Sequence, residues 1–434
     1  MRTQLFCYVF LSDFVPGEVE LKACRWWTRG WTLQELLAPE NLTFYDTTWK
    51  AVGTKLSLIK EISEITNVEL RVLLNKSQIF SCSVSQRMSW AAFRKLTRIE
   101  DEAYCLLGIF GIHMPLLYGE GRMAFRRLQE EIIKRSADLT IFFWSTPQND
   151  IDKPQHASLF AESPSAFSLT MPLQPVKLGF PEYFITNKGV FFSSVADLTV
   201  IKDAEQDDEI YAFLLGWDHD SVPSAIRIRK IGPGIFCRDG GSLVCGEMGV
   251  SSTTDSFYIL TDPEPRTVEE LIIQHRHKVL RIPHNEQVQL QFAVPSHSWD
   301  VTDRVFLLTP KGSAFRYNPV NPYPTLLAMS FYVQFGSITV NLVVLYEIGF
   351  NIFEWKRYPN QASDIFRRQN REKSILSSDF RQLMPDIASL RNGVEVRLDE
   401  DQLVYISVTI GEGTLQVMSK EISVWDIVFK VKTI

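Results

Sequence analysis

The residues of this chain that are best suited to chemistry lie in one short segment, Arg25–Pro39. Trp31 and Glu35 stand four positions apart, so a helix would present the indole and the carboxylate on one face. A carboxylate held in a partly apolar setting can stabilise an oxocarbenium-like transition state, which makes Glu35 the candidate catalytic residue. The alternative is structural, with Glu35 tying its helix to a neighbouring arginine through an ion pair. The residues that would support the site are Trp31, Arg25, Arg29 and Trp27.

Strands and helices are expected to alternate around this segment. Apolar runs predict strands at Leu5–Leu11 and Leu42–Asp46, and Trp26–Leu37 is expected to be one helix that Pro39 closes. Apolar residues at helical spacing predict a second helix over Lys55–Ile65. Such alternation indicates an α/β layer with a parallel sheet.

Residues 79–147 are expected to form a helical segment. Thr97–Glu100 has the pattern of a capping box, and Gly119–Gly121 is expected to open a further helix. On the outer side of that helix the spacing predicts two ion pairs, Arg126–Glu130 and Arg127–Glu131. The residues expected to face inward from it are Phe125, Leu128, Ile132 and Ile133.

Residues 155–434 are expected to be β-rich. Short apolar runs alternate there with turn signals such as Gly232–Gly234 and Gly411–Gly413, a pattern that favours antiparallel sheets in a sandwich-like arrangement of one or two units. The predicted strands are Tyr183–Ile185, Ile210–Trp217, Ala225–Ile231, Ser256–Leu260, Val288–Val294, Val305–Leu308, Ser337–Tyr346, Val394–Leu398, Leu403–Ile410 and Val424–Val431.

Two stretches resemble known fungal protein segments. Residues 29–39, RGWTLQELLAP, closely resemble the last signature box of the heterokaryon incompatibility (HET) domain of filamentous fungi. Residues 7–13, CYVFLSD, resemble a segment that follows two earlier boxes in that domain, and neither box is found here, so we expect 1–78 to be its C-terminal part. Residues 88–131 resemble the domain of unknown function that commonly follows, which assigns 79–147 to a helical post-HET domain.

This resemblance implies a fold and a function. HET domains are distantly similar to TIR domains, in which a Glu within a W-x-x-x-E helix cleaves the nicotinamide–ribose bond of NAD. The resemblance therefore implies a TIR-like layer, Glu35 as catalytic carboxylate, and NAD as substrate with no bound cofactor. It also implies an effector of fungal innate immunity that triggers programmed cell death, with protein partners and self-association, while the β-rich region would sense the partner.

Two alternatives to this enzyme stay open. The first is a non-catalytic interaction module whose face of Trp26, Trp27 and Trp31 is a docking or core surface. The second is an inert remnant of a HET-family gene.

Composition excludes several other classes of protein. The net charge is −6 with no basic tail, which argues against a nucleic-acid binder. The six cysteines are scattered singly, as in a cytoplasmic protein with reduced thiols. No apolar stretch approaches the about 18 residues that a membrane span needs.

The remaining chemical motifs of the sequence are weaker. Gly119–Ala124 fits the G-x-G-x-x-A pattern of a dinucleotide-binding turn, but a helix-start turn between packed helices is the preferred interpretation. His275 and His277 would share one face of a strand, with no complete set of metal ligands nearby, so no metal site is expected. Asp203–Glu209 is interpreted as a charged hairpin tip, and Cys105 as a buried, inert thiol.

Overall fold

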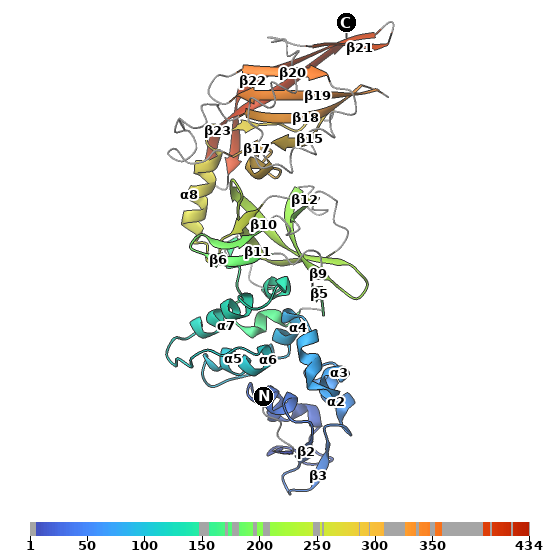
Figure 1. Cartoon of the computed structure of the whole chain (residues 1–434), viewed down its shortest axis with the longest axis vertical. Coiled ribbons are helices and arrows are strands. Elements are labelled where there is room, and N and C mark those ends of the chain that lie inside the picture. Colours follow the sequence, from blue (N-terminus) through green and yellow to red (C-terminus); the bar gives the residue numbers. More distant parts are fainter. Residues whose placement is uncertain are drawn as a thin grey trace.

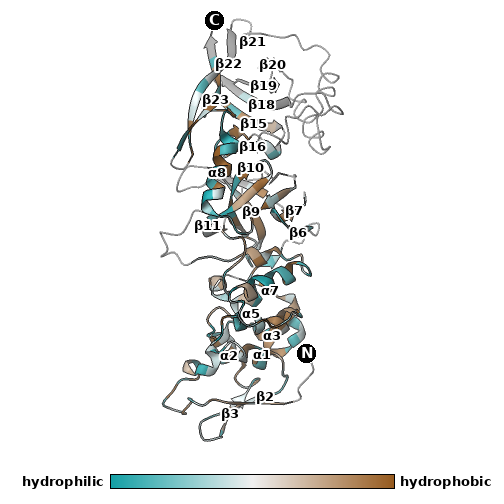
Figure 2. Cartoon of the chain, turned by 90° about the vertical axis from the view of Figure 1, so that its left-hand side faces the viewer, coloured by the Kyte–Doolittle hydropathy of each residue, from teal (hydrophilic) through white to brown (hydrophobic). Residues whose placement is uncertain are grey.

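Five regions follow one another along an elongated molecule in the computed structural model. A three-stranded sheet lies at one end, a group of short helices and a ten-stranded sheet follow, and the other end holds a six-stranded and a four-stranded sheet (Figure 1). The same succession is visible from the side (Figure 2). The structure describes residues 6–146, 156–169, 172–175, 182–193, 198–202, 209–245, 252–253, 256–285, 287–294, 296–307, 326–335, 338–347, 352–357, 394–399, 402–417 and 420–433.

The first sheet combines parallel and antiparallel pairing. Strand β1 (Cys7–Phe10) pairs in parallel with β2 (Leu42–Tyr45), as the alternation of elements predicts, whereas β3 (Ala51–Thr54), which was not predicted, is antiparallel to β2. Helix α2 (Ile59–Thr66) follows and matches the C-terminal part of the expected second helix. The 3-10 helix η1 (Leu21–Ala23) lies between β1 and β2 on the chain.

The single helix expected over Trp26–Leu37 is wrong. The structure has a 3-10 turn η2 (Arg25–Thr28) and a six-residue helix α1 (Thr32–Leu37), separated by the extended residue Arg29. The backbone breaks because it pairs with a later segment: the Gly30 amide donates to the Lys95 carbonyl at 3.3 Å, and Arg29 forms a bridge with Lys95. Long-range pairing therefore overrides the local helical pattern.

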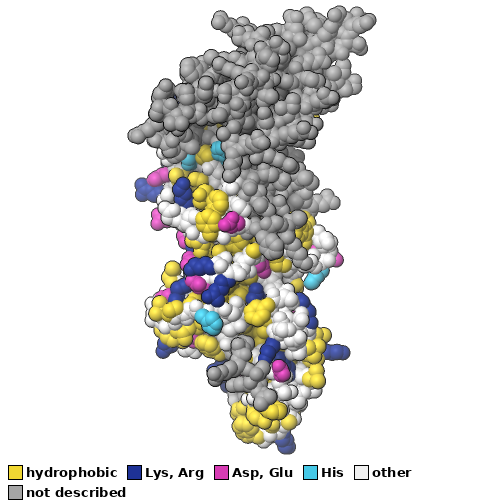
Figure 3. Space-filling model, in the orientation of Figure 1, with side chains coloured by type: hydrophobic (Ala, Val, Ile, Leu, Met, Phe, Trp, Pro, Cys, Tyr) yellow, Lys and Arg dark blue, Asp and Glu magenta, His cyan; other side chains and the backbone are white. Residues whose placement is uncertain are grey.

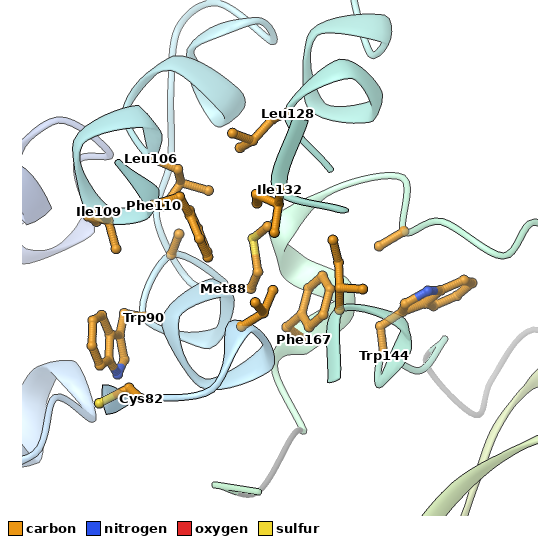
Figure 4. Packing of buried hydrophobic residues seen from close by; sticks show 14 of the residues in the cluster. Cys82, Met88, Trp90, Leu106, Ile109, Phe110, Leu128, Ile132, Trp144 and Phe167 are labelled. Atoms are coloured by element: carbon orange, nitrogen blue, oxygen red, sulfur yellow. The ribbon is translucent and has the colours of Figure 1, made fainter. Parts of the chain in front are cut away.

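Short helices form the second region around one longer helix, α7 (Met123–Ile133), whose four predicted inward residues are all buried. Met88 and Trp90 lie between these helices in the core, Met88 close to Ile132 and Phe167 (Figure 4). The other helices here are α3 (Leu70–Leu74), η3 (Lys76–Ser81), α4 (Val84–Ser89), α5 (Asp101–Tyr104), α6 (Leu107–Phe110) and η4 (Leu139–Phe142).

Two local predictions for these helices are wrong and one is confirmed. The N-cap of α5 is Glu100, without a side-chain cap, so Thr97–Glu100 does not form the expected capping box. Arg126 pairs with Glu130 at 2.9 Å as predicted. Arg127 instead pairs with Glu120, and Glu131 with Lys134, because these partners lie closer than the expected one.

The ten-stranded sheet is antiparallel except for the parallel pair β11–β13. The 3-10 helix η5 (Pro164–Phe167) lies between its first two strands on the chain. The tip of the predicted hairpin at Asp203–Glu209 lies outside the described residues except for Glu209, but the flanking strands β8 and β9 pair as a hairpin requires. The strands are β4 (His156–Ala157), β5 (Gln174–Pro175), β6 (Tyr183–Thr186), β7 (Gly189–Phe192), β8 (Leu198–Lys202), β9 (Glu209–Trp217), β10 (Pro223–Gly232), β11 (Ile235–Cys245), β12 (Ser252–Thr253) and β13 (Phe257–Ile259).

Helix α8 (Pro265–Arg276) leads to the last two sheets, so the strand expected at His275–His277 is wrong. The six-stranded sheet has the order β16-β17-β14-β23-β22-β21 and the four-stranded sheet β15-β18-β19-β20. The elements are β14 (Leu280–Arg281), β15 (Val288–Val294), η6 (Ser296–Ser298), β16 (Trp299–Asp300), β17 (Val305–Phe306), β18 (Leu326–Phe335), β19 (Ile338–Glu347), β20 (Ile352–Arg357), β21 (Val394–Asp399), β22 (Gln402–Val417) and β23 (Lys420–Thr433).

The turn expected at Gly411–Gly413 is also wrong, because β22 continues through it. A Cβ on Gly413 would lie 2.1 Å from Oδ2 of Asp426, whose carboxylate pairs with Arg281 at 2.7 Å. The glycine therefore makes room for a cross-strand ion pair.

One apolar cluster runs from the first sheet to the ten-stranded sheet, from Val9 to Ile259. It crosses the sequence boundaries expected near residues 78 and 147. The division into three domains, and the TIR-like character of the first layer, stay predictions.

Candidate functional site

The segment from Gly30 to Leu37 is fixed in place by contacts with the helices that follow it. Gln34 Nε2 donates to the carbonyl of Cys105 at 2.6 Å, and the Thr32 hydroxyl donates to the carbonyls of Trp26 and Arg29, both at 2.7 Å. Leu33, Leu36 and Leu37 are fully buried. The main structural role of this segment, residues 29–39, called the signature below, is therefore to pack against the helices that follow.

Arg94 and Leu96 clamp the start of this unit. One Nη of Arg94 donates at 2.9 Å to both the Arg29 carbonyl and the Thr32 hydroxyl, and Nε donates to the carbonyl of Trp90. A Cβ on Gly30 would lie 2.3 Å from Leu96, so only glycine fits there without a shift. Sequence reasoning missed Arg94, because two of its partners, the Arg29 carbonyl and the Thr32 hydroxyl, lie 65 and 62 positions away along the chain.

Trp31 and Glu35 are the members of α1 and its cap that face outward together. Trp31 is 37% exposed and Glu35 is exposed, so the one-face geometry of the prediction is present. The expectation of a sheltered carboxylate is wrong for the described residues, because buried leucines and Gln34 take the inner positions of the helix. The pKa of the Cys7 thiol is raised, mainly by burial and to a smaller extent by the negative charge of Glu35.

The supporting residues have other partners. Arg25 pairs with Asp13 at 3.3 Å, and the side chain of Arg29 is exposed. Among the described residues Glu35 forms an ion pair with neither arginine, so the structural alternative of such a pair is wrong. Trp27 is buried and donates its indole N–H to the Leu21 carbonyl at 2.7 Å. Trp26 packs edge-on against Trp27 and Phe44, with ring centroids 4.8 and 5.6 Å apart. Only Trp31 of the three tryptophans is therefore available to a partner.

Further apolar side chains lie exposed on the same end of the molecule. Tyr8 and Trp49 are 66% and 65% exposed, and the Trp49 ring stacks on Phe10 with centroids 4.7 Å apart. Figure 3 shows hydrophobic side chains gathered at the lower end of the molecule, over the first sheet. The surface around the signature is thus more apolar than a solvated face needs to be.

The glycine turn before α7 does not present a free phosphate site. The amides of Gly119 and Gly121 donate to Oε1 of Glu100 at 2.7 and 3.2 Å. The pKa of the Glu100 carboxyl is lowered by hydrogen bonds from backbone amides, first its own and then those of Gly119 and Gly121. An internal carboxylate occupies the amides that a pyrophosphate would need, which agrees with the interpretation as a helix-start turn.

A buried thiol and imidazole meet in the ten-stranded sheet. Cys237 Sγ lies 3.4 Å from Nδ1 of His156, and both residues are buried. Burial raises the pKa of Cys237 to about 12. The pKa of His156 is lowered, mainly by burial and to a smaller extent by the positive charge of Arg229. The pair is neutral and closed to solvent, unlike a catalytic thiolate–imidazolium pair. Cys105 is equally buried, and burial raises its pKa to about 12.

The described part of the chain holds neither a cluster of metal ligands nor a helix that could span a membrane. No group of three or more His, Cys, Asp or Glu side chains is arranged there to hold a metal ion. Of the two histidines considered as metal ligands, His275 is buried in α8 and His277 is exposed beyond its end. In that part of the chain every helix is too short or too polar to traverse a bilayer.

Comparisons with known proteins match parts of the chain. The chain is 39% identical over 155 residues to the vegetative incompatibility protein HET-E-1 of Podospora anserina. This match covers 33% of the chain and 11% of that protein, so the chain spans only a small part of this relative's length. A family model described as a domain of unknown function, DUF8212, matches residues 123–185. No solved structure matches the chain.

These matches confirm part of the resemblance seen in the sequence. Similarity to a vegetative incompatibility protein is present, and so is a match to a domain of unknown function. That domain begins within the expected range 79–147 and extends beyond it to β6. The truncation of the HET domain and the order of the two domains stay predictions.

Proposed function

We propose that this chain is a heterokaryon-incompatibility effector that acts in the cytoplasm in fungal non-self recognition and leads to programmed cell death. The similarity to HET-E-1 supports this proposal at the level of the family. The observation that carries the proposal is the exposed pair Trp31 and Glu35, because the opposite side of the same helix is buried and hydrogen-bonded to the rest of the protein. The β-rich region of residues 155–434 is proposed to sense the partner.

The exposed pair is suited to recognition by a protein. Tryptophan is the side chain most enriched among residues that dominate binding energy, and an ordered helix presents it at little entropic cost. The contacts of Thr32, Gln34 and Arg94 keep α1 in place. We therefore propose that the Trp31–Glu35 face contacts a partner protein or a second copy when the effector is activated.

Induced expression in a filamentous fungus tests the proposal. We expect the wild-type chain to cause cell death and Trp31→Ala to abolish it, while the folded level of the protein is unchanged. Trp49→Ala is the matched control, because this tryptophan is exposed on the same end of the molecule but outside the signature. Killing by Trp31→Ala at the wild-type level would contradict the proposal, as would the absence of killing by the folded wild type.

NAD cleavage by Glu35 is the second candidate function. The observation in its favour is that the carboxylate is accessible and shares its face with an indole, so a second molecule packed over this face could shelter it. We expect NAD to fall after induction of the wild type and to stay constant with Glu35→Gln. The exposed Glu40→Gln is the control variant. Equal NAD loss with Glu35→Gln would remove the enzymatic candidate while leaving the recognition role of Trp31 intact.

A further inference from the structure

A cavity of about 1000 Å³ lies between η3 and the segment that runs from α6 to Leu116. Its volume is at the upper end of the range of about 300–1,000 Å³ that small-molecule sites occupy. Most of its wall is apolar, made by Ile79, Phe80, Leu107, Ile112, Met114 and Leu116. This cavity is separate from the Trp31–Glu35 face and plays no part in the function proposed above.

Several of the apolar wall residues are open to solvent. Phe80 is 64% exposed and Leu116 is 51% exposed. Gly111, with a φ of +65°, lets the chain turn beneath the Phe80 ring, which a Cβ would meet at 3.6 Å. An open apolar wall of this kind costs free energy in water, and an apolar ligand would recover that cost.

The polar side chains that line the cavity are Lys76, Ser77 and His113, and Lys76 marks its cationic corner. The ammonium nitrogen of Lys76 is shielded from water and makes no hydrogen bond with any residue that the structure describes. Its nearest carboxylate oxygen is Oε1 of Glu40, at 3.5 Å, on a side chain that is 69% exposed. Glu40 thus pairs with Lys76, but the ammonium makes no hydrogen bond to it, so its donors stay open to an anion that comes closer.

Positive charge exceeds negative charge around this corner. Lys55 lies close by, 5% exposed, with Nζ donating to the Pro39 carbonyl at 3.2 Å. Its pKa is lowered to about 8, first by burial and then by the charge of Lys76, with Glu40 acting in the opposite direction. Two ammonium groups thus share one exposed carboxylate, which leaves a net positive charge for an incoming anion.

We propose that this cavity binds a long-chain carboxylate, with the headgroup at Lys76 and the hydrocarbon chain along the apolar wall. Charge complementarity selects an anion, and the size and apolar character of the wall select a hydrocarbon tail. A carboxylate accepts the charge-assisted hydrogen bonds that Lys76 lacks.

Titration calorimetry of the full chain with decanoate and with decanol tests the contributions of the carboxylate headgroup and of the hydrocarbon chain. We expect decanoate to bind at least about tenfold more tightly than decanol, the size of one charge-assisted hydrogen bond. Lys76→Met should remove this preference and leave decanol binding unchanged, while the exposed Lys60→Met should change neither. Glu40→Gln should keep or tighten decanoate binding, because it removes the competing carboxylate.

Leu116→Asp tests the place of the tail. It puts a negative charge on the exposed wall, so we expect weaker decanoate binding without loss of folding, and Leu169→Asp, 69% exposed and outside the cavity, should have no effect. The proposal is overturned if the folded wild type does not bind decanoate or binds both ligands equally. It is also overturned if Lys76→Met weakens both ligands alike, which would indicate a damaged cavity instead of a lost headgroup contact.

Discussion

Two buried cations show what single residues contribute to this structure. Arg238 is fully buried, and no carboxylate among the described residues pairs with it. Its guanidinium donates to the carbonyls of Phe142, Trp144 and Gly240 and stacks on the Trp144 ring, 3.6 Å from its centroid. Burial lowers its pKa to about 9, so it stays charged at neutral pH. The second cation, Lys55, donates a hydrogen bond to the Pro39 carbonyl, and its pKa is lowered to about 8, close to neutral pH.

Arg238→Met is expected to destabilise the fold. The substitution leaves buried carbonyls of Phe142 and Trp144 without donors, and we expect the free energy of unfolding to fall by about 2–4 kcal/mol. Urea unfolding of the full chain measures this change. Arg266→Met, at a side chain that is 91% exposed, is the control and should stay within about 0.5 kcal/mol of the wild type. Equal stability of both variants would show that the carbonyls find other donors.

Lys55 predicts a dependence of stability on pH. Its pKa is 10.5 in the ordinary state and about 8 in the fold, so between these values the unfolded chain binds more protons than the folded one. The contribution of Lys55 to the free energy of unfolding therefore rises with pH across that window, by about 3 kcal/mol. We expect the stability difference between wild type and Lys55→Met to shift by this amount in favour of the wild type. A difference that stays constant with pH would contradict the lowered pKa.

At the scale of elements, the sequence predicted those whose pattern is local. The inward face of α7 and the strands β1, β2, β9 and β10 follow from apolar spacing alone. The break at Arg29–Gly30 does not, because it depends on pairing with Lys95. Helix α8 was missed for a related reason: His275 near its end and His277 just beyond it suggested a strand, while its buried face, Val268 and Ile272, is set by packing against distant strands.

At the site, too, the sequence predicted what depends on local spacing and missed what depends on long-range contacts. Sequence spacing correctly put Trp31 and Glu35 on one face, since four positions make about one helical turn. It could not tell which way that face points. Gln34 contributes to this choice, because its hydrogen bond to the distant Cys105 carbonyl holds the other side of α1 inward.

Gly30→Ala is expected to disturb the contact between the signature and the helices. The new Cβ would lie 2.3 Å from Leu96 Cδ2 and 2.6 Å from its Cγ, so the whole side chain must move. We expect a loss of about 1–3 kcal/mol in the free energy of unfolding. Leu96→Ala creates the missing space, so the double variant should lose less than the sum of the two single variants. Strict additivity in this double-mutant cycle would show that the two residues are not in contact.

At the scale of the whole molecule, one polar junction joins the ten-stranded sheet to the six-stranded sheet. Arg276 at the end of α8 is fully buried, pairs with Asp300 and Asp303, and donates to the Lys230 carbonyl of β10 at 2.8 Å. The turn after β16 is held by Tyr211 of β9, whose hydroxyl accepts from the Val301 amide at 2.8 Å. No single-sequence pattern reveals this junction, because its members come from four separate elements.

Asp300→Ala is expected to weaken this junction strongly. It leaves the Arg276 charge buried with only the partly exposed Asp303 as carboxylate partner, and we expect a loss of about 3–5 kcal/mol in the free energy of unfolding. Replacing both charges, as Arg276→Met with Asp300→Leu, removes the uncompensated charge and should restore most of that loss. Urea unfolding measures the energies, and limited proteolysis shows whether residues beyond α8 are cleaved first. If the double variant is as unstable as Asp300→Ala, the cost lies in lost packing of the turn and not in the stranded charge.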